Sequence, residues 1–190
     1  MDRRSLLVGL GAAAASPVLA QDTPHWPSPV IDMHFHIRRD PALNVAHQRG
    51  AGITAANLLA RGTVTDVAAL RAQDPALFPC WFASSDVAKP EAVPILTQAI
   101  KDGAKGFGEL KYPVAADGPE MRRIYDLAAE LNAPVLLHFQ EVGQPAAPGG
   151  YNMGIKRFGA ILKAYPRTRF IGHGDAFWAN ISADYHEQES

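Results

Sequence analysis

The chain has 190 residues, of which 47% are hydrophobic and 19% are charged, and its formal net charge is -1. This composition is typical of one soluble globular domain, and the near-neutral charge argues against a nucleic-acid partner. The single cysteine, Cys80, excludes an internal disulfide, so the domain must rely on its apolar core.

The N-terminal segment has the pattern of an export signal. Arg3-Arg4 precede an apolar stretch from Leu6 to Ala15, and Val18-Leu19-Ala20 provides the small residues at which a signal peptidase cuts. The stretch is too short to span a bilayer comfortably. We therefore expect a signal peptide over residues 1–20 and a mature domain over residues 21–190 that has no membrane span.

The arginine pair also suggests an export route. Arg3-Arg4 followed by Ser5-Leu6-Leu7 resembles a twin-arginine signal, but Asp2 stands where Ser or Thr is more usual and no Lys follows the leucines. An ordinary secretory signal is the alternative. Both interpretations predict an exported protein, periplasmic or secreted.

The first expected strand of the mature domain contains two histidines one residue apart, His34 and His36. Side chains alternate between the faces of a strand, so both imidazoles should share a face with Asp32. The opposite face should pack against the core through Ile31, Met33, Phe35 and Ile37. Two imidazoles so placed can reach one metal ion. Because the motif is short, hydrogen bonding in a polar pocket is the alternative interpretation.

Expected helices and strands alternate along the rest of the chain. Further strands are predicted at residues 52–59, 77–83, 104–111, 134–139 and 169–172. Helices are predicted at residues 41–48, 66–73, 90–99 and 119–131, and a last one after the Gly/Pro-rich loop 143–150 should carry the apolar stripe Ile155, Phe158, Leu162 and Tyr165. This alternation predicts an α/β fold with a parallel sheet and right-handed crossovers, open or closed into a barrel.

Several polar residues fall at the carboxyl ends of these strands: His34, His36, Glu109, Lys111, His138 and His173. In a (β/α) barrel that end carries the active site. Each residue alone has an ordinary structural interpretation, such as a core histidine bonded to backbone or an ion pair between Glu109 and Lys111. Four histidines at the same end of successive strands instead predict a shared site.

The motifs Asp32-Met33-His34-Phe35-His36, Glu109, His138 and Gly172-His173-Gly174-Asp175 together resemble strands one, four, five and six of the amidohydrolase superfamily, in particular its amidohydrolase-related branch. The resemblance covers residues 29–190. It implies a metal-dependent TIM barrel in which His34, His36 and His138 are metal ligands. His173 would be a further ligand or the group that orients the attacking water.

The chain departs from that family in length. The family barrel has eight strand-helix units, whereas about six are predicted here. The family's strand-eight aspartate would lie beyond Ser190, and residues 178–190 have the character of a polar loop. We therefore expect an incomplete (β/α)8 TIM barrel over residues 21–190 and a chain that is a fragment of a longer protein.

The expected cofactor is a divalent metal, with zinc favoured by the imidazole ligands. The leading expectation is hydrolysis of an amide, ester or lactone bond by a metal-activated water, with His173 and Glu109 as catalytic residues and Glu109 also a candidate ligand. Non-oxidative decarboxylation on the same metal platform is one alternative. A catalytically inactive metal-binding fragment is the other, since a fold does not determine a reaction.

A small-molecule substrate is expected beneath two long segments, residues 140–153 and 175–186. The candidate substrate-binding residues are Lys111, Asp175 and Trp178. Other side chains of these segments could line the pocket or simply cap the barrel: Tyr151, Phe177 and His186.

Overall fold

The computed structural model describes residues 26–40, 42–60, 64–141 and 150–183. The strands are β1 (Ile31–His36), β2 (Ala55–Ala60), β3 (Cys80–Ala83), β4 (Gly106–Leu110), β5 (Val135–His138) and β6 (Phe170–His173). The helices are α1 (Ala42–Gly50), α2 (Val64–Gln73), α3 (Ala92–Lys101), α4 (Pro119–Glu130), the 3₁₀ helix η1 (Ile155–Arg157), α5 (Phe158–Ala164) and α6 (Asp175–Ile181). The predicted signal peptide over residues 1–20 lies outside the described residues.

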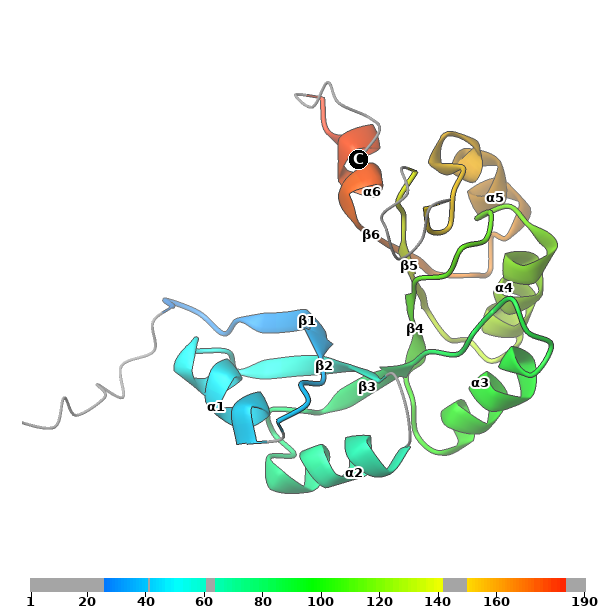
Figure 1. Ribbon diagram of the computed structural model, residues 1–190. Helices are drawn as coiled ribbons and strands as arrows, with labels where there is room; N and C mark the ends of the chain where they lie inside the picture. Colours follow the sequence, from blue (N-terminus) through cyan, green and yellow to red (C-terminus); the bar gives the residue numbers. More distant parts are fainter. Residues whose placement is uncertain (1–25, 41, 61–63, 142–149, 184–190) are drawn as a thin grey trace, which may run out of the picture.

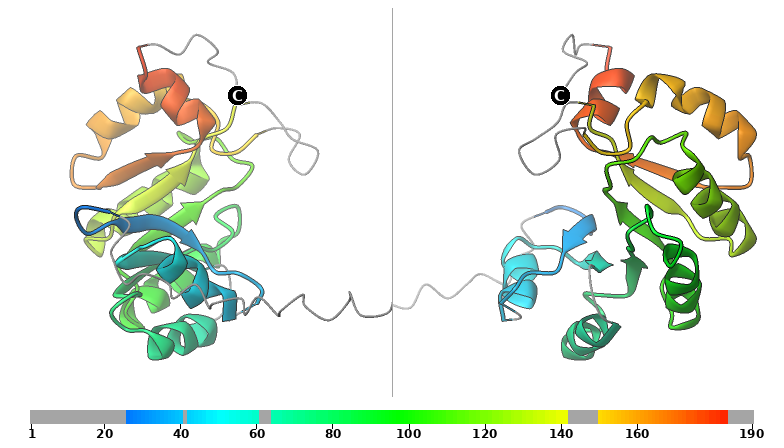
Figure 2. Two further views of the ribbon diagram at one scale, coloured as in Figure 1. Left: turned by 90° about the vertical axis from the view of Figure 1, so that its left-hand side faces the viewer. Right: turned by 45° about the vertical axis from the view of Figure 1, so that its right-hand side comes forward.

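The strands form one six-stranded parallel sheet in sequence order, from β1 to β6. The sheet curls, and helices follow one another around its outer side (Figures 1 and 2). This arrangement is a half-barrel of the TIM type, so the predicted incomplete barrel is confirmed. None of the described helices combines the length and apolarity needed to cross a membrane.

The main core lies between the sheet and its helices. Alternate strand residues such as Leu58, Phe107 and Leu137 face outward and are fully buried. The large α4 residue Tyr125 packs in this layer, and its hydroxyl donates to the carbonyl oxygen of Ala116 at 2.7 Å. That hydrogen bond removes the penalty of burying a phenol.

A second, smaller cluster fills the inner side of the curl, where Leu59, Phe82 and Leu136 pack together. Two glycines of β4 make room for it. A Cβ at Gly106 would lie 2.8 Å from the Phe82 ring, and one at Gly108 would lie 2.6 Å from Cβ of Leu136. The sequence Gly106-Phe107-Gly108 therefore lets the interior close directly below Glu109.

The apolar face predicted for the first strand is only partly correct. Phe35 is buried and stacks on Phe78 with 5.9 Å between ring centroids, but Ile31 and Met33 are exposed. The reason is position, because among the strands that the structure describes β1 lies at the edge and pairs with β2 alone. In the described residues, packing covers the Phe35 end of the strand and leaves Ile31 and Met33 at the surface.

Two expectations for the C-terminal part are wrong. Ile161 is buried and Leu162 is 47% exposed, because a 3₁₀ turn precedes α5 and places Ile155, Phe158 and Ile161 on one side at a spacing of three. The polar loop predicted over residues 178–190 is wrong at its start, because residues 178–181 belong to α6.

Candidate metal centre

Five side chains from four strands meet at the carboxyl edge of the sheet. They are His34 and His36 of β1, Glu109 of β4, His138 of β5 and His173 of β6. Their nitrogen and oxygen atoms form two groups, each with all its donor atoms within 4.8 Å of one another, and Glu109 belongs to both. Carboxyl ends of neighbouring parallel strands share one rim, which brings residues 139 positions apart into one cluster.

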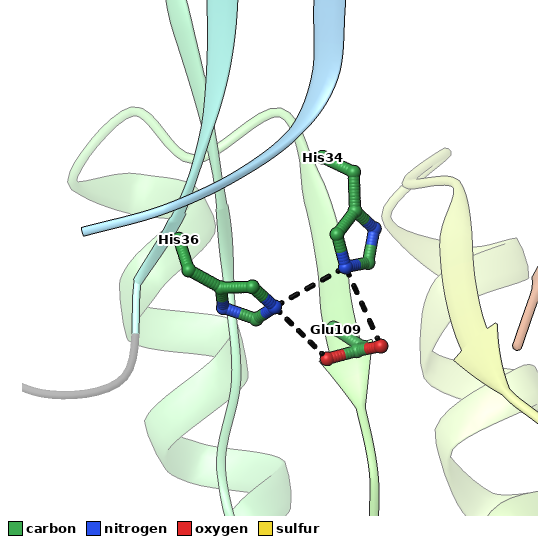
Figure 3. A group of neighbouring side chains, drawn as sticks. All are labelled: His34, His36 and Glu109. Atoms are coloured by element: carbon green, nitrogen blue, oxygen red, sulfur yellow. Dashed lines mark hydrogen bonds and ion pairs between the residues drawn. The ribbon is translucent and has the colours of Figure 1, made fainter. Parts of the chain in front are cut away.

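The first group contains His34, His36 and Glu109 (Figure 3). Nε2 of His36 lies 3.2 Å from Oε2 of Glu109, and Nε2 of His34 lies 3.5 Å from Oε1. The two imidazole nitrogens are 3.2 Å apart. All three side chains thus point their donor atoms at the same small space.

The second group contains Glu109, His138 and His173. Oε1 of Glu109 lies 2.7 Å from Nδ1 of His138 and 3.1 Å from Nδ1 of His173. The two Nδ1 atoms are 3.2 Å apart. The rings of His34 and His173 stack with their centroids 3.8 Å apart, so the two groups are contiguous.

This arrangement brings the lone pairs of facing imidazole nitrogens together, in the pair His34 and His36 and in the pair His138 and His173. In each histidine pair one facing nitrogen must carry a proton, because two unprotonated imidazole nitrogens at this distance repel each other. A divalent cation would remove that conflict, since it accepts both lone pairs. The donor set therefore fits a metal ion on chemical grounds.

The charge states also suit a metal. Burial by itself would raise the pKa of Glu109, which is 4% exposed, but hydrogen bonds with His138, His173 and His36 outweigh it and hold that pKa far below its usual range. Burial, followed by repulsion from His173, lowers the pKa of His34 to about 4. An ionised carboxylate and a neutral imidazole are the forms that bind metal.

Two side chains that the sequence analysis did not assign hold β1 in place. The register of β1 against β2 shifts between Asp32 and Phe35, so His34 lies at an irregular point of the strand. Oδ1 of Asp32 accepts from the backbone N–H of His34 at 2.9 Å, and Oδ2 accepts from Nε2 of buried Gln48 at 2.8 Å. The strand pattern alone predicts for Asp32 no more than a place on the face of the histidines.

Asn152 holds β4 and β5 in place, and the sequence pattern did not predict this role. Its Nδ2 donates to the carbonyl oxygens of Leu110, at 2.6 Å, and of His138, at 2.8 Å. Its side chain is 0% exposed, and its backbone N–H donates to Tyr112. One amide thus joins the backbone at His138 to that of the residue after Glu109. Its only sequence signal was an Asn at the end of a Gly/Pro-rich segment.

The predicted substrate-binding residues lie in different surroundings. Lys111 shares a hollow of about 400 Å³ with His36, Glu109 and Tyr151, and its Nζ lies 5.0 Å from the centre of the Tyr151 ring. Asp175 and Trp178 lie on α6, where the exposed Trp178 contacts Phe177 at a ring-centroid distance of 5.5 Å. His186 lies outside the described residues. The roles assigned to these residues stay predictions.

Comparison with known proteins gives a structural likeness only. No protein-family model and no curated protein matches the sequence. A crystal structure from Staphylococcus aureus, named as a candidate amidohydrolase, aligns with a TM-score of 0.50 and 17% identity over 76% of this chain and 66% of that one. This likeness shows a shared fold.

A second crystal structure also aligns. It is a probable 2-pyrone-4,6-dicarboxylic acid hydrolase from Acinetobacter baumannii with citric acid bound, and it aligns with a TM-score of 0.47 and 16% identity over 78% of this chain and 58% of that one. The chain therefore spans less than two thirds of the length of either protein.

Proposed function

We propose that the protein is a metal-dependent hydrolase. The observation that carries the proposal is the convergence of four imidazoles on the carboxylate of Glu109 at the rim of a parallel half-barrel. The name of the Staphylococcus aureus protein that shares the fold, a candidate amidohydrolase, agrees with this reaction class. Since the chain spans only 66% of that protein, the activity is proposed for the whole protein.

The donor types favour zinc. Imidazole nitrogen and carboxylate oxygen are common zinc ligands, and neither group of donors includes a thiolate. A divalent ion held there would lower the pKa of a water molecule and polarise the bond to be cleaved. We propose His34, His36, His138 and Glu109 as the residues that hold it.

His173 and Glu109 are the proposed catalytic residues. His173 remains about one third exposed, so its ring is accessible to a substrate and a water molecule. It can accept or return a proton while His138 and Glu109 fix the position of its Nδ1. Glu109 belongs to both donor groups, and all metal binding at this rim should therefore depend on its carboxylate.

The hollow beside the cluster is proposed to admit a small-molecule substrate. Lys111 is the one of the predicted substrate-binding residues that lies in it, and among the described residues its ammonium group forms no ion pair. We propose that Lys111 binds a polar or anionic group of the substrate. Asp175 and Trp178 would contribute from α6, and export of the protein is proposed from the pattern of residues 1–20.

The test combines metal analysis with hydrolysis. The purified full chain should retain a divalent metal after dialysis and should cleave amides, esters or lactones in a manner abolished by a chelator and restored by zinc. In ¹⁸O-labelled water, hydrolysis puts the label into the product acid, whereas the alternative decarboxylation releases carbon dioxide. A protein that retains no metal would contradict the proposal.

A further inference from the structure

A second cavity opens on the other side of His36. It has a volume of about 360 Å³ and lies where the ends of β1 and β2 meet α1 and α2. Figure 1 shows these two helices beside the two strands. Pockets that bind small molecules have volumes of this order.

The cavity has an apolar floor. Leu59, Ala60 and Leu70 are buried side chains that line it, and Ile37 and Ala69 complete its apolar surface. A floor of this kind binds hydrocarbon or an aromatic ring in preference to water. The polar hollow that contains Lys111 shares one lining residue with this cavity, His36.

His36 lines both spaces, so the cavity adjoins the candidate metal centre. A molecule whose reacting bond lies at His34, His36 and Glu109 can therefore place an adjoining group in the cavity. The segment between β1 and α1 that forms one wall is held by buried Asn44, whose Oδ1 accepts from the backbone N–H of Arg38 at 2.9 Å.

The edge of the cavity carries an excess of positive charge. Of the described residues that line it, Arg38 and Arg39 are cationic and Asp66 is anionic. Arg38 has a neighbour, because its Nη2 lies 3.1 Å from Nε2 of His47. Arg39 forms no ion pair within the part of the chain that the structure describes. A guanidinium group in this position can bind a carboxylate through two hydrogen bonds.

We propose that this cavity binds the apolar part of a carboxylate-bearing substrate and that Arg39 pairs with the carboxylate. The inference rests on the proposed hydrolase function and names its substrate class: small molecules in which a hydrocarbon or aromatic segment separates the scissile bond from an anionic group. Arg39 is a specificity-determining residue in this scheme, and Ala69 is an exposed lining residue of α2 at which a larger side chain would narrow the cavity.

The experiment measures binding without turnover. The full chain is loaded with zinc and titrated calorimetrically with 3-phenylpropanoate and with 3-phenylpropanamide, which has the same shape but no charge. The acid should bind about tenfold more tightly than the amide. Arg39→Gln should remove this preference and leave amide binding unchanged. Ala69→Leu should weaken the binding of both probes, because the larger side chain narrows the cavity.

The matched control is Arg167→Gln, an exposed arginine that precedes β6 at the opposite edge of the sheet. It should bind both probes as the wild type does. Equal affinity for acid and amide, or an unchanged preference in Arg39→Gln, would overturn the inference. Metal content is measured on every sample. A chain that takes up no zinc contradicts the proposed hydrolase function but not the proposed cavity, because both probes can still be titrated into the metal-free protein.

Discussion

Glu109 and His138 are 29 residues apart in sequence, yet Oε1 of the first lies 2.7 Å from Nδ1 of the second. The contact exists because β4 and β5 are neighbouring parallel strands whose carboxyl ends face the same side. Glu109 touches the histidines of β1 and β6 as well, so one carboxylate connects four strands. The predictions below begin from this residue.

Glu109→Gln should strongly weaken metal binding at the rim. The amide keeps the size of the side chain but loses the charge shared by both donor groups. We expect metal affinity to fall at least about a hundredfold, since even residues that only support ligands change affinity by 10- to 100-fold. Competition with a chromophoric chelator measures this. Wild-type affinity in the variant would show that Glu109 is no ligand.

His34→Ala combined with His36→Ala should remove the first donor group and reduce the bound metal by at least one equivalent per chain. The control is His47→Ala, because His47 is an exposed histidine of α1 whose described side-chain contact is with Arg38. Elemental analysis after dialysis gives the stoichiometry. Equal metal content in the double variant and the control would place the site elsewhere.

Asn152→Leu should destabilise the protein by about 2–3 kcal/mol, because it leaves the buried carbonyl oxygens of Leu110 and His138 without a donor. Asn152→Asp separates the loss of the hydrogen-bond donor from backbone strain. Asp also tolerates the positive φ of 46° at this position, but its carboxylate cannot donate a hydrogen bond. Both variants should lower the midpoint of urea unfolding and weaken metal binding. Normal metal affinity in both would show that Asn152 stabilises without positioning the ligands.

Gly108→Ala should lower the free energy of unfolding by on the order of 3 kcal/mol. The new Cβ would lie 2.6 Å from Cβ of Leu136, and the φ of +145° at this position is unfavourable for a side chain. Gly159→Ala is the matched control, because Gly159 is in α5 and a Cβ there meets nothing within 4 Å. The control should be neutral or slightly stabilising. Thermal unfolding of the pair compares the two directly.

The stability of the metal-free protein should rise with pH between about 4 and about 6.5. Burial and His173 lower the pKa of His34 from 6.5 to about 4, so in this range the unfolded chain binds a proton that the folded chain does not. The contribution of neutral His34 to the free energy of unfolding is fully present above the upper pH value and is lost as pH falls through the range. Urea unfolding with a chelator present should show this rise, reduced in His34→Asn and retained in His47→Asn. An identical rise in both variants would exclude His34 as its source.

The alternating pattern of the sequence determined the parallel sheet, because apolar strands and amphipathic helices of these lengths have few other ways to cover one another. It also indicated that His34, His36, Glu109, His138 and His173 lie at strand ends. A common edge follows from parallel strands, and the structure brings these residues together there.

The tertiary structure alone decided which atoms meet and what holds them. The two donor groups on Glu109 depend on how far the sheet curls, and the hydrogen bonds of Gln48 and Asn152 join elements that are distant in sequence. Ile31 and Met33 are exposed because β1 is an edge strand, and Ile161 is buried because a 3₁₀ turn precedes α5. Periodicity reports which residues share a face of one element, whereas contacts between elements are set by packing, for which a single sequence carries no local signal.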